Sequence, residues 1–205
     1  MTPVLDIHTH HPAPAPGAVV SLSAVQLVAH YGSPGEVVLL PDQMYSIGIH
    51  PWETTLEPLA DNVLQMLEAV AARPQVVAIG ECGVDAAKGA PMFRQVQLLR
   101  KQIELSERFS KPLIIHDVKA HDVIIGLRKE LSPKQRWAIH GFRGKPSVAE
   151  MFTRLGIYLS FGEKFNPDTV RAIPEELMLA ETDEAPVTIQ EVVKALSDAR
   201  GTDLA

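Results

Sequence analysis

Short apolar runs alternate with longer amphipathic stretches along most of the chain. The runs are rich in Val, Ile and Leu, which is typical of parallel strands that are buried on both faces and covered by helices. Eight of them are candidate strands, at residues 4–8, 19–22, 45–50, 76–81, 113–116, 137–140, 157–160 and 177–182. Eight strands close a β/α barrel. The pattern therefore predicts an α/β fold of the TIM-barrel type.

The stretches between the runs carry apolar residues at helical spacing, with polar or charged residues on the opposite face. They predict helices at residues 59–72, 92–109, 119–131 and 189–200, and shorter ones at 147–154 and 167–173. Strand and helix therefore alternate through the last two thirds of the chain, as in a βα repeat.

The first third breaks this rhythm. Only residues 23–30 look helical between the second and third candidate strands, and the stiff Pro-rich segment 12–17 replaces a helix between the first two. We expect a barrel that is distorted and shortened here. Strands one to three either pair antiparallel or sit irregularly, and residues 37–40 are a candidate edge strand.

Length and composition narrow the class of protein. A chain of 205 residues with 46% hydrophobic and 21% charged residues fits one globular domain over residues 1–205. The net charge of −6 does not supply the general positive field that grips long duplex DNA, so any contact with nucleic acid should be local.

Cysteine usage and hydropathy suggest a compartment. Cys82 is the single cysteine, which excludes an internal disulfide and a thiolate-cluster zinc site and fits a reducing cytoplasm. The chain shows no signal-type segment, and no apolar run approaches the roughly 20 residues of a membrane helix. We expect a cytoplasmic protein with no membrane contact, and a monomer as the simplest state.

Ionisable residues stand where several apolar runs end. His8 and His10 lie two apart at a strand end, so both side chains point the same way and can bind one cation. Glu81 ends the fourth run, and Gly80 and Gly83 around it would let backbone come close to whatever the carboxylate holds. A carboxylate has two oxygens and can bridge two metal ions.

Two later runs end in histidine, His116 and His140, and the last ends in Asp183. Taken singly, each histidine is as well explained as a hydrogen-bonded core residue, and Glu81 as the partner of a basic side chain. Together they form the ligand inventory of a binuclear hydrolase, in which Asp183 can also take a proton from bound water.

Six motifs occur in an order that resembles one known family. They are "DIHTH", "GIHPW", "IGECGVD", "QVQLLRKQIELSERFSKPLIIH", "HGFRG" and "ETD". They are similar to the motifs of the TatD family of metal-dependent deoxyribonucleases, which belongs to the amidohydrolase-like barrels. The resemblance covers nearly the whole chain, and the chain looks like a short member.

The resemblance implies a pair of divalent ions, such as magnesium, manganese or zinc. His8, His10, Glu81 and Asp183 would bind one ion, while Glu81, His116 and His140 would bind the other. Glu81 and Asp183 would be the catalytic residues, as the bridge and as the proton acceptor. The family hydrolyses phosphodiesters and often trims DNA from its 3′ end, so DNA ends or short single strands are the expected substrate.

The chain departs from the family pattern at several positions. Val118 stands where the family has an arginine, Glu184 is an extra acid after the last motif, and the region before "GIHPW" is compressed. We expect His50 to contact substrate or support a ligand, and Trp52 either to stack a base or, more simply, to pack. A basic rim is expected to bind substrate, with ordinary solvated charges as the alternative; its members are Arg143, Lys145 and Lys164.

Two other functions fit the same residues. One is a metal-dependent hydrolase of a small phosphate ester or an amide, because a barrel does not fix its substrate. The other is a non-catalytic metal-binding barrel, against which the complete set of ligand-type residues argues.

Overall fold

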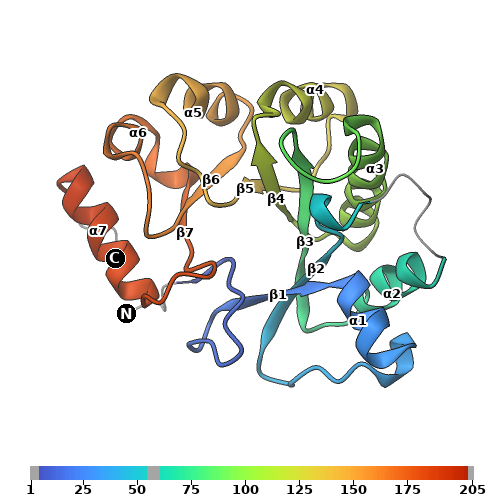
Figure 1. Cartoon of the computed structure of the whole chain (residues 1–205). Coiled ribbons are helices and arrows are strands. Elements are labelled where there is room, and N and C mark those ends of the chain that lie inside the picture. Colours follow the sequence, from blue (N-terminus) through green and yellow to red (C-terminus); the bar gives the residue numbers. More distant parts are fainter. Residues whose placement is uncertain (1–4, 55–60, 203–205) are drawn as a thin grey trace.

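The computed structural model describes residues 5–54 and 61–202. In this part of the chain seven strands form one parallel sheet, in which each strand pairs with the next in sequence. The sheet curls into a ring, and Figure 1 shows the strands arranged around its centre. The strands are β1 (Val19–Ser23), β2 (Met44–Gly48), β3 (Val76–Asp85), β4 (Leu113–Val118), β5 (Trp137–Ile139), β6 (Tyr158–Phe161) and β7 (Met178–Ala180).

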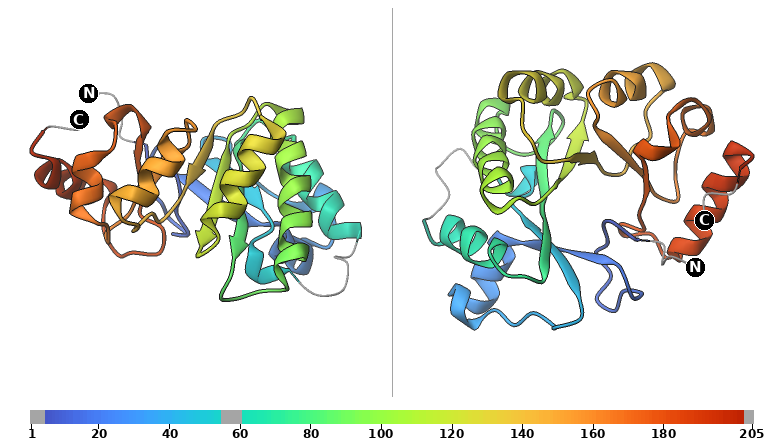
Figure 2. Two further views of the ribbon diagram at one scale, coloured as in Figure 1. Left: turned by 90° about the horizontal axis from the view of Figure 1, so that it is seen from above. Right: turned by 180° about the vertical axis from the view of Figure 1, so that it is seen from behind.

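Helices follow the strands and lie on the outside of the ring, as the two further views in Figure 2 show. Their apolar faces pack on the sheet around fully buried side chains such as Trp137 and Phe152. The α-helices are α1 (Ala24–Tyr31), α2 (Asp61–Ala71), α3 (Met92–Phe109), α4 (His121–Leu131), α5 (Pro146–Thr153), α6 (Pro167–Ala172) and α7 (Ile189–Arg200). Three 3₁₀ turns accompany them, η1 (Pro34–Glu36), η2 (Pro51–Glu53) and η3 (Glu175–Leu177).

The two edges of the sheet are joined by the segment Asp6–Thr9, which makes parallel bridges to both. On one side the Ile7 N–H donates to the Ala180 carbonyl of β7, and on the other the Thr9 N–H donates to the Val19 carbonyl of β1. The first apolar run thus closes the ring, although it is too short to count as a strand. The expected TIM-type α/β fold with an irregular N-terminal third is confirmed.

Two details of the expected N-terminal third are wrong. The antiparallel alternative for the first three candidate strands is wrong: residues 10–18 carry the chain back as a loop without a helix, so the segment Asp6–Thr9 bridges β1 in parallel and β1 pairs with β2 in parallel. Residues 37–40 form no edge strand, because their neighbourhood is tied down otherwise: the Arg73 guanidinium donates to the carbonyls of Pro34 and Val37, and the Leu40 N–H donates to the Tyr45 hydroxyl. Two expected elements are described only in part, because Val4, Leu59 and Ala60 lie outside the described residues.

A register shift in β3 sets the direction of the Glu81 side chain. Ile79 pairs with Leu113 and Cys82 with Ile115, so β3 holds one more residue than β4 over this stretch. Such a bulge re-aims the side chains that follow it. A methyl group on Gly83 would lie 2.0 Å from the His116 carbonyl oxygen, and one on Gly80 would lie 2.4 Å from the Ile114 carbonyl oxygen. The glycines therefore let β4 approach β3, and the expectation that they also let backbone come close to whatever Glu81 holds stays a prediction.

Within the described ranges, no helix is both long and apolar enough to cross a bilayer.

Candidate metal centre

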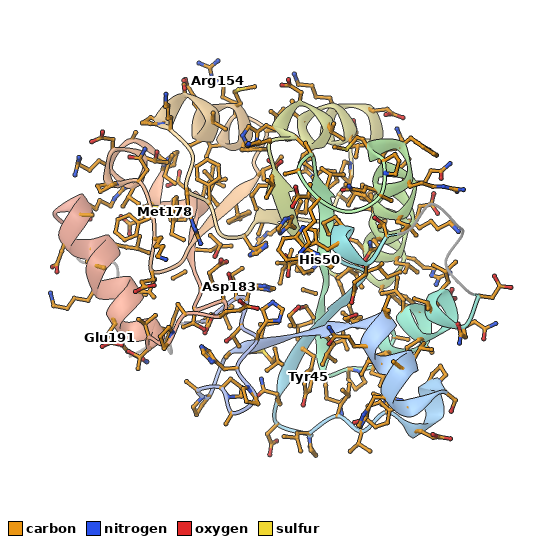
Figure 3. The ribbon with its side chains drawn as sticks, viewed as in Figure 1. Tyr45, His50, Arg154, Met178, Asp183 and Glu191 are labelled. Atoms are coloured by element: carbon orange, nitrogen blue, oxygen red, sulfur yellow. The ribbon has the colours of Figure 1, made fainter. Side chains whose placement is uncertain are left out.

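The six expected ligands come together at the carboxyl ends of the strands. They reach this place from five parts of the chain: the N-terminal segment that closes the ring, β3, β4, the end of β5, and the turn after β7. An open cavity of about 340 Å³ lies over them. Figure 3 shows His50 and Asp183 reaching the centre of the ring from different elements.

One group of ligand atoms surrounds the Nε2 atoms of His8 and His10. Each of these nitrogens lies 3.5 Å from Glu81 Oε2 and 3.8 Å from Asp183 Oδ1. These spacings exceed ordinary hydrogen bonds and are close to those of neighbouring ligands around one cation, which at bonds of about 2.1 Å lie roughly 3 to 3.5 Å apart.

His8 supplies a test of whether a cation fits this group. Its side chain is fully buried, and neither ring nitrogen has a hydrogen-bond partner in the described structure. Buried polar atoms are nearly always satisfied, so an orphaned imidazole among carboxylates calls for a missing partner. A divalent ion is a partner that satisfies the imidazole and both carboxylates together.

A second group surrounds the other oxygen of Glu81. Glu81 Oε1 lies 2.9 Å from His116 Nδ1 and 2.7 Å from His140 Nε2, and these two nitrogens are 3.3 Å apart. The two oxygens of Glu81 thus face two different clusters. Burial raises the pKa of the Glu81 carboxyl, but the imidazoles of His140, His10 and His116 outweigh it, so the pKa lies well below its usual value and the group is ionised.

Each imidazole of the second group has another carboxylate on its outer side. His116 Nε2 lies 3.4 Å from Asp85 Oδ2, and His140 Nδ1 lies 3.4 Å from Glu181 Oε1. A carboxylate only accepts, so each outer acid favours a proton on the outer nitrogen and leaves the inner nitrogen free to bind a cation. Burial lowers the pKa of His140, but attraction to Glu81 and Glu181 raises it well above its usual value.

His50 has a different arrangement. Its Nδ1 accepts the backbone N–H of Trp52 at 3.1 Å, so the remaining proton of the neutral ring is on Nε2, which faces Glu81 Oε1 at 2.9 Å. A protonated nitrogen donates a hydrogen bond and does not ligate a metal. The geometry therefore favours the expected supporting or substrate-contacting role of His50, and a ligand set of the other six residues.

Backbone contacts hold the two ends of the site together. Asp183 has φ = 52°, its N–H donates to the His8 carbonyl, and the His10 N–H donates to the Asp183 carbonyl. Beside it, the buried Thr182 hydroxyl donates to Asp6 Oδ2 at 2.6 Å. His8, His10 and Asp183 are thus fixed relative to one another by the closure of the ring.

The expected substrate contacts are placed less centrally. Arg143, Lys145 and Lys164 are exposed in the loops after β5 and β6, form no ion pair within the described part of the chain, and are absent from the cavity lining. Val118 ends β4, half-buried, and the exposed Glu184 lines the cavity. The substrate-binding role of the three basic residues stays a prediction.

Sequence reasoning assigned no role to Asp85 and Glu181, whose carboxylates lie 3.4 Å from the outer nitrogens of the two later histidines. Both follow apolar runs, "CGV" and "LMLA". This is the signal that pointed to Glu81, and applied again it would have found both. Which of the two acids in "ETD" faces the cavity is not visible in the sequence.

A curled parallel β/α barrel with a histidine and carboxylate cluster at its carboxyl end is typical of metal-dependent barrel hydrolases. The family model "TatD related DNase" matches residues 37–203, so the chain belongs to the TatD family. The resemblance seen in the sequence is confirmed.

Two named relatives are similar in sequence to part of this chain. The chain is similar to the "uncharacterized metal-dependent hydrolase YjjV" of Escherichia coli, 33% identical over 148 residues, which are 67% of this chain and 56% of that protein. It is also similar to the "3'-5' ssDNA/RNA exonuclease TatD" of Erwinia tasmaniensis, 28% identical over 155 residues, or 70% of this chain and 59% of that one. The matched regions thus span somewhat more than half the length of these relatives.

Solved structures show the same fold. The crystal structure of YjjV from E. coli superposes with a TM-score of 0.70 and 22% identity, covering 96% of this chain and 90% of that chain. A TatD family hydrolase from Entamoeba histolytica superposes with a TM-score of 0.71 and 16% identity, covering 98% and 92%.

Proposed function

We propose that this chain is a divalent-metal-dependent hydrolase that cleaves phosphodiester bonds at the ends of DNA, with short single strands as substrate. The observation that carries the proposal is the carboxylate of Glu81, whose two oxygens face two separate ligand clusters. Such an arrangement suits a pair of cations that share one bridging carboxylate. The named activity of the TatD relative from Erwinia supports the same substrate class.

His8, His10, Glu81 and Asp183 would hold one ion, and Glu81, His116 and His140 the other. Divalent ions such as magnesium, manganese or zinc would neutralise the phosphate, lower the pKa of a water molecule and stabilise the leaving oxygen. The protein's own groups do the rest. Asp183, one third exposed and facing the cavity, accepts the proton, and His50 Nε2–H donates toward the reacting group beside Glu81.

The cavity favours a chain end over a long duplex. Among the described residues that line it, none is Lys or Arg, whereas Glu53 and Glu184 are present beside the ligand carboxylates. Acidic side chains repel the many phosphates of a duplex, and the net charge of −6 adds to this. Phosphates beyond the scissile one would meet the outer loops of Arg143, Lys145 and Lys164.

An oligonucleotide assay tests the proposal. The full chain in excess manganese is given a 3′-labelled single strand, and release of mononucleotides is followed for the wild type and Glu81→Ala. We expect release by the wild type and a loss of at least about a thousandfold in the variant, because both clusters lose their shared oxygen donor. Loss of activity smaller than tenfold in Glu81→Ala would overturn the assignment.

A second candidate is a hydrolase of a small phosphate ester or amide, because the described lining residues include no Lys or Arg that would hold the further phosphates of a strand. Turnover of bis(p-nitrophenyl) phosphate without release of nucleotides would select it. A non-catalytic barrel would retain less than one ion per chain after purification in excess manganese.

We further infer that residues 1–205 act as one domain, because strands from every part of the chain share one sheet. A cytoplasmic monomer without membrane contact remains our prediction for the state in which it acts.

A further inference from the structure

Trp52 is placed unlike an ordinary core tryptophan. It is 48% exposed and lines the cavity over the candidate metal centre, whereas the second tryptophan of the chain, Trp137, is fully buried. Single exposed apolar side chains are common, but an indole that lines the cavity over the candidate metal centre is placed to contact whatever enters it.

The indole is also held in a fixed orientation. Its Nε1–H donates to Asp85 Oδ2 at 2.6 Å, and its backbone N–H donates to His50 Nδ1 at 3.1 Å. The ring makes edge contacts with the imidazoles of His50 and His116, at centroid distances of 4.8 and 5.7 Å. A ring that is already held in place loses little conformational entropy when a ligand stacks on it.

A cation lies over the same ring. Lys88 Nζ is 3.3 Å from the centroid of the Trp52 ring, and Lys88 is exposed with no ion pair in the described structure. Its backbone is anchored, since its N–H donates to Asp85 Oδ1 and its carbonyl accepts from Gln95 Nε2. An aromatic face and an ammonium group together match a planar base that carries a phosphate.

We propose that Trp52 and Lys88 form a nucleotide subsite at the edge of the metal centre. The nucleobase displaces the Lys88 ammonium from the indole face and stacks there, and the ammonium pairs with the phosphate of the same nucleotide. Val118 stands where the family has an arginine, and Lys88 would supply the positive charge that is missing at that position. This inference rests on the proposed function, and it names the feature of the substrate that is recognised: an intact base next to the scissile phosphate.

Fluorescence tests stacking without any turnover. Of the two tryptophans, Trp52 is the exposed one, so quenching of exposed-tryptophan emission reports on its face. The full chain, without added metal, is titrated with deoxyadenosine monophosphate and with deoxyribose 5-phosphate. We expect saturable quenching by the nucleotide, none by the sugar phosphate, and none by either in Trp52→Leu. Equal quenching by both compounds, or none by the nucleotide, would overturn the subsite.

Calorimetry separates stacking from the support of Asp85. Trp52→Phe keeps an aromatic face but loses the indole N–H, and Trp52→Leu loses both. We expect Trp52→Phe to bind deoxyadenosine monophosphate within about threefold of the wild type, and Trp52→Leu to bind it about tenfold to a hundredfold more weakly. Equal losses in the two variants would show that the indole N–H matters and stacking does not.

Lys88→Met isolates the phosphate contact. Its affinity for deoxyadenosine monophosphate should fall about fivefold or more, while its affinity for deoxyadenosine should not fall. An unchanged affinity for both ligands would remove Lys88 from the subsite. Because these are binding measurements, they can succeed even where the oligonucleotide assay fails, so failure of the subsite and failure of the proposed reaction are distinguishable.

Discussion

Glu181 places a fully buried carboxylate oxygen 3.4 Å from Nδ1 of His140, on the side of the ring away from Glu81. The same oxygen accepts the backbone N–H of Gly141 at 2.6 Å, so the acid is fixed to the backbone next to the histidine it faces. His140 is thereby held between two carboxylates. One of these would share a cation with it, and the other would set its tautomer.

Replacing the outer acid should weaken metal binding while leaving the ligands in place. For Glu181→Gln we expect a metal affinity lower by about tenfold to a hundredfold, because the neutral amide favours the outer proton of His140 less. Titration with manganese followed by calorimetry measures it. Glu176→Gln, an exposed acid on η3, is the matched control and should bind as the wild type does. Equal affinity in both variants would rule out an orienting role for Glu181.

Removal of metal should destabilise the fold and leave a proton on His140. The raised pKa of His140 in the metal-free site means that binding a cation expels a proton, so metal affinity should rise with pH. At a hundredfold excess over Kd the ion adds about 2.7 kcal/mol, which raises Tm by roughly 5 to 10 °C for a chain of this size. Scanning calorimetry with and without chelator checks the shift, and Glu81→Ala should lose it.

The approach of β4 to β3 depends on Gly83. At φ = 142°, an alanine methyl would press on the His116 carbonyl at 2.0 Å, and backbone cannot yield as a flexible side chain can. We expect Gly83→Ala to lower the free energy of unfolding by about 1 to 3 kcal/mol and to weaken metal binding, since His116 must move.

Gly126 provides the control for this substitution. It lies in α4 with no atom within 4 Å of an added methyl group, so Gly126→Ala should stabilise the protein by about 0.5 to 1 kcal/mol. Urea unfolding of both variants gives the comparison. A Gly83→Ala variant as stable as the wild type would show that β4 can shift freely.

The start of α7 should lose stability in acid. The Thr188 backbone N–H and hydroxyl both donate to Glu191 Oε2, and these hydrogen bonds lower the pKa of Glu191, the backbone one most. A lowered pKa in the folded state contributes stability above the unfolded-state pKa, which is lost as pH falls through the folded-state pKa. The stability gap between the wild type and Glu191→Gln should therefore close as the solution is acidified. A gap that is constant with pH would contradict this.

Periodicity in the sequence predicted much of the fold. The spacing of apolar residues located α3 and α7 to the residue, because a helix that packs one face on a sheet must repeat that face every three to four positions. It failed where a side chain replaced a regular partner, as at Val37, whose carbonyl is bound by Arg73 instead of a neighbouring strand. It also did not show that residues 10–18 carry the chain back as a loop, so that β1 lies parallel to the segment Asp6–Thr9.

The site was predictable in kind but not in detail. Six ligand-type residues at strand ends were visible, because buried charge needs a strong partner. The role of His50 as a donor depends on which nitrogen accepts the Trp52 N–H, and the bulge in β3 depends on contacts with β4. Such contacts join residues far apart in the chain, and no local pattern encodes them.

The closure of the ring has a consequence for the folding of the chain during its synthesis. Asp6 meets Thr182 across 176 positions, and His8 meets Asp183 at the same seam. Because a ribosome delivers the chain from its amino end, His8 and His10 emerge long before the acid that completes their cluster. A nascent chain therefore cannot assemble the six-residue cluster until Asp183, which follows the last strand, has left the exit tunnel.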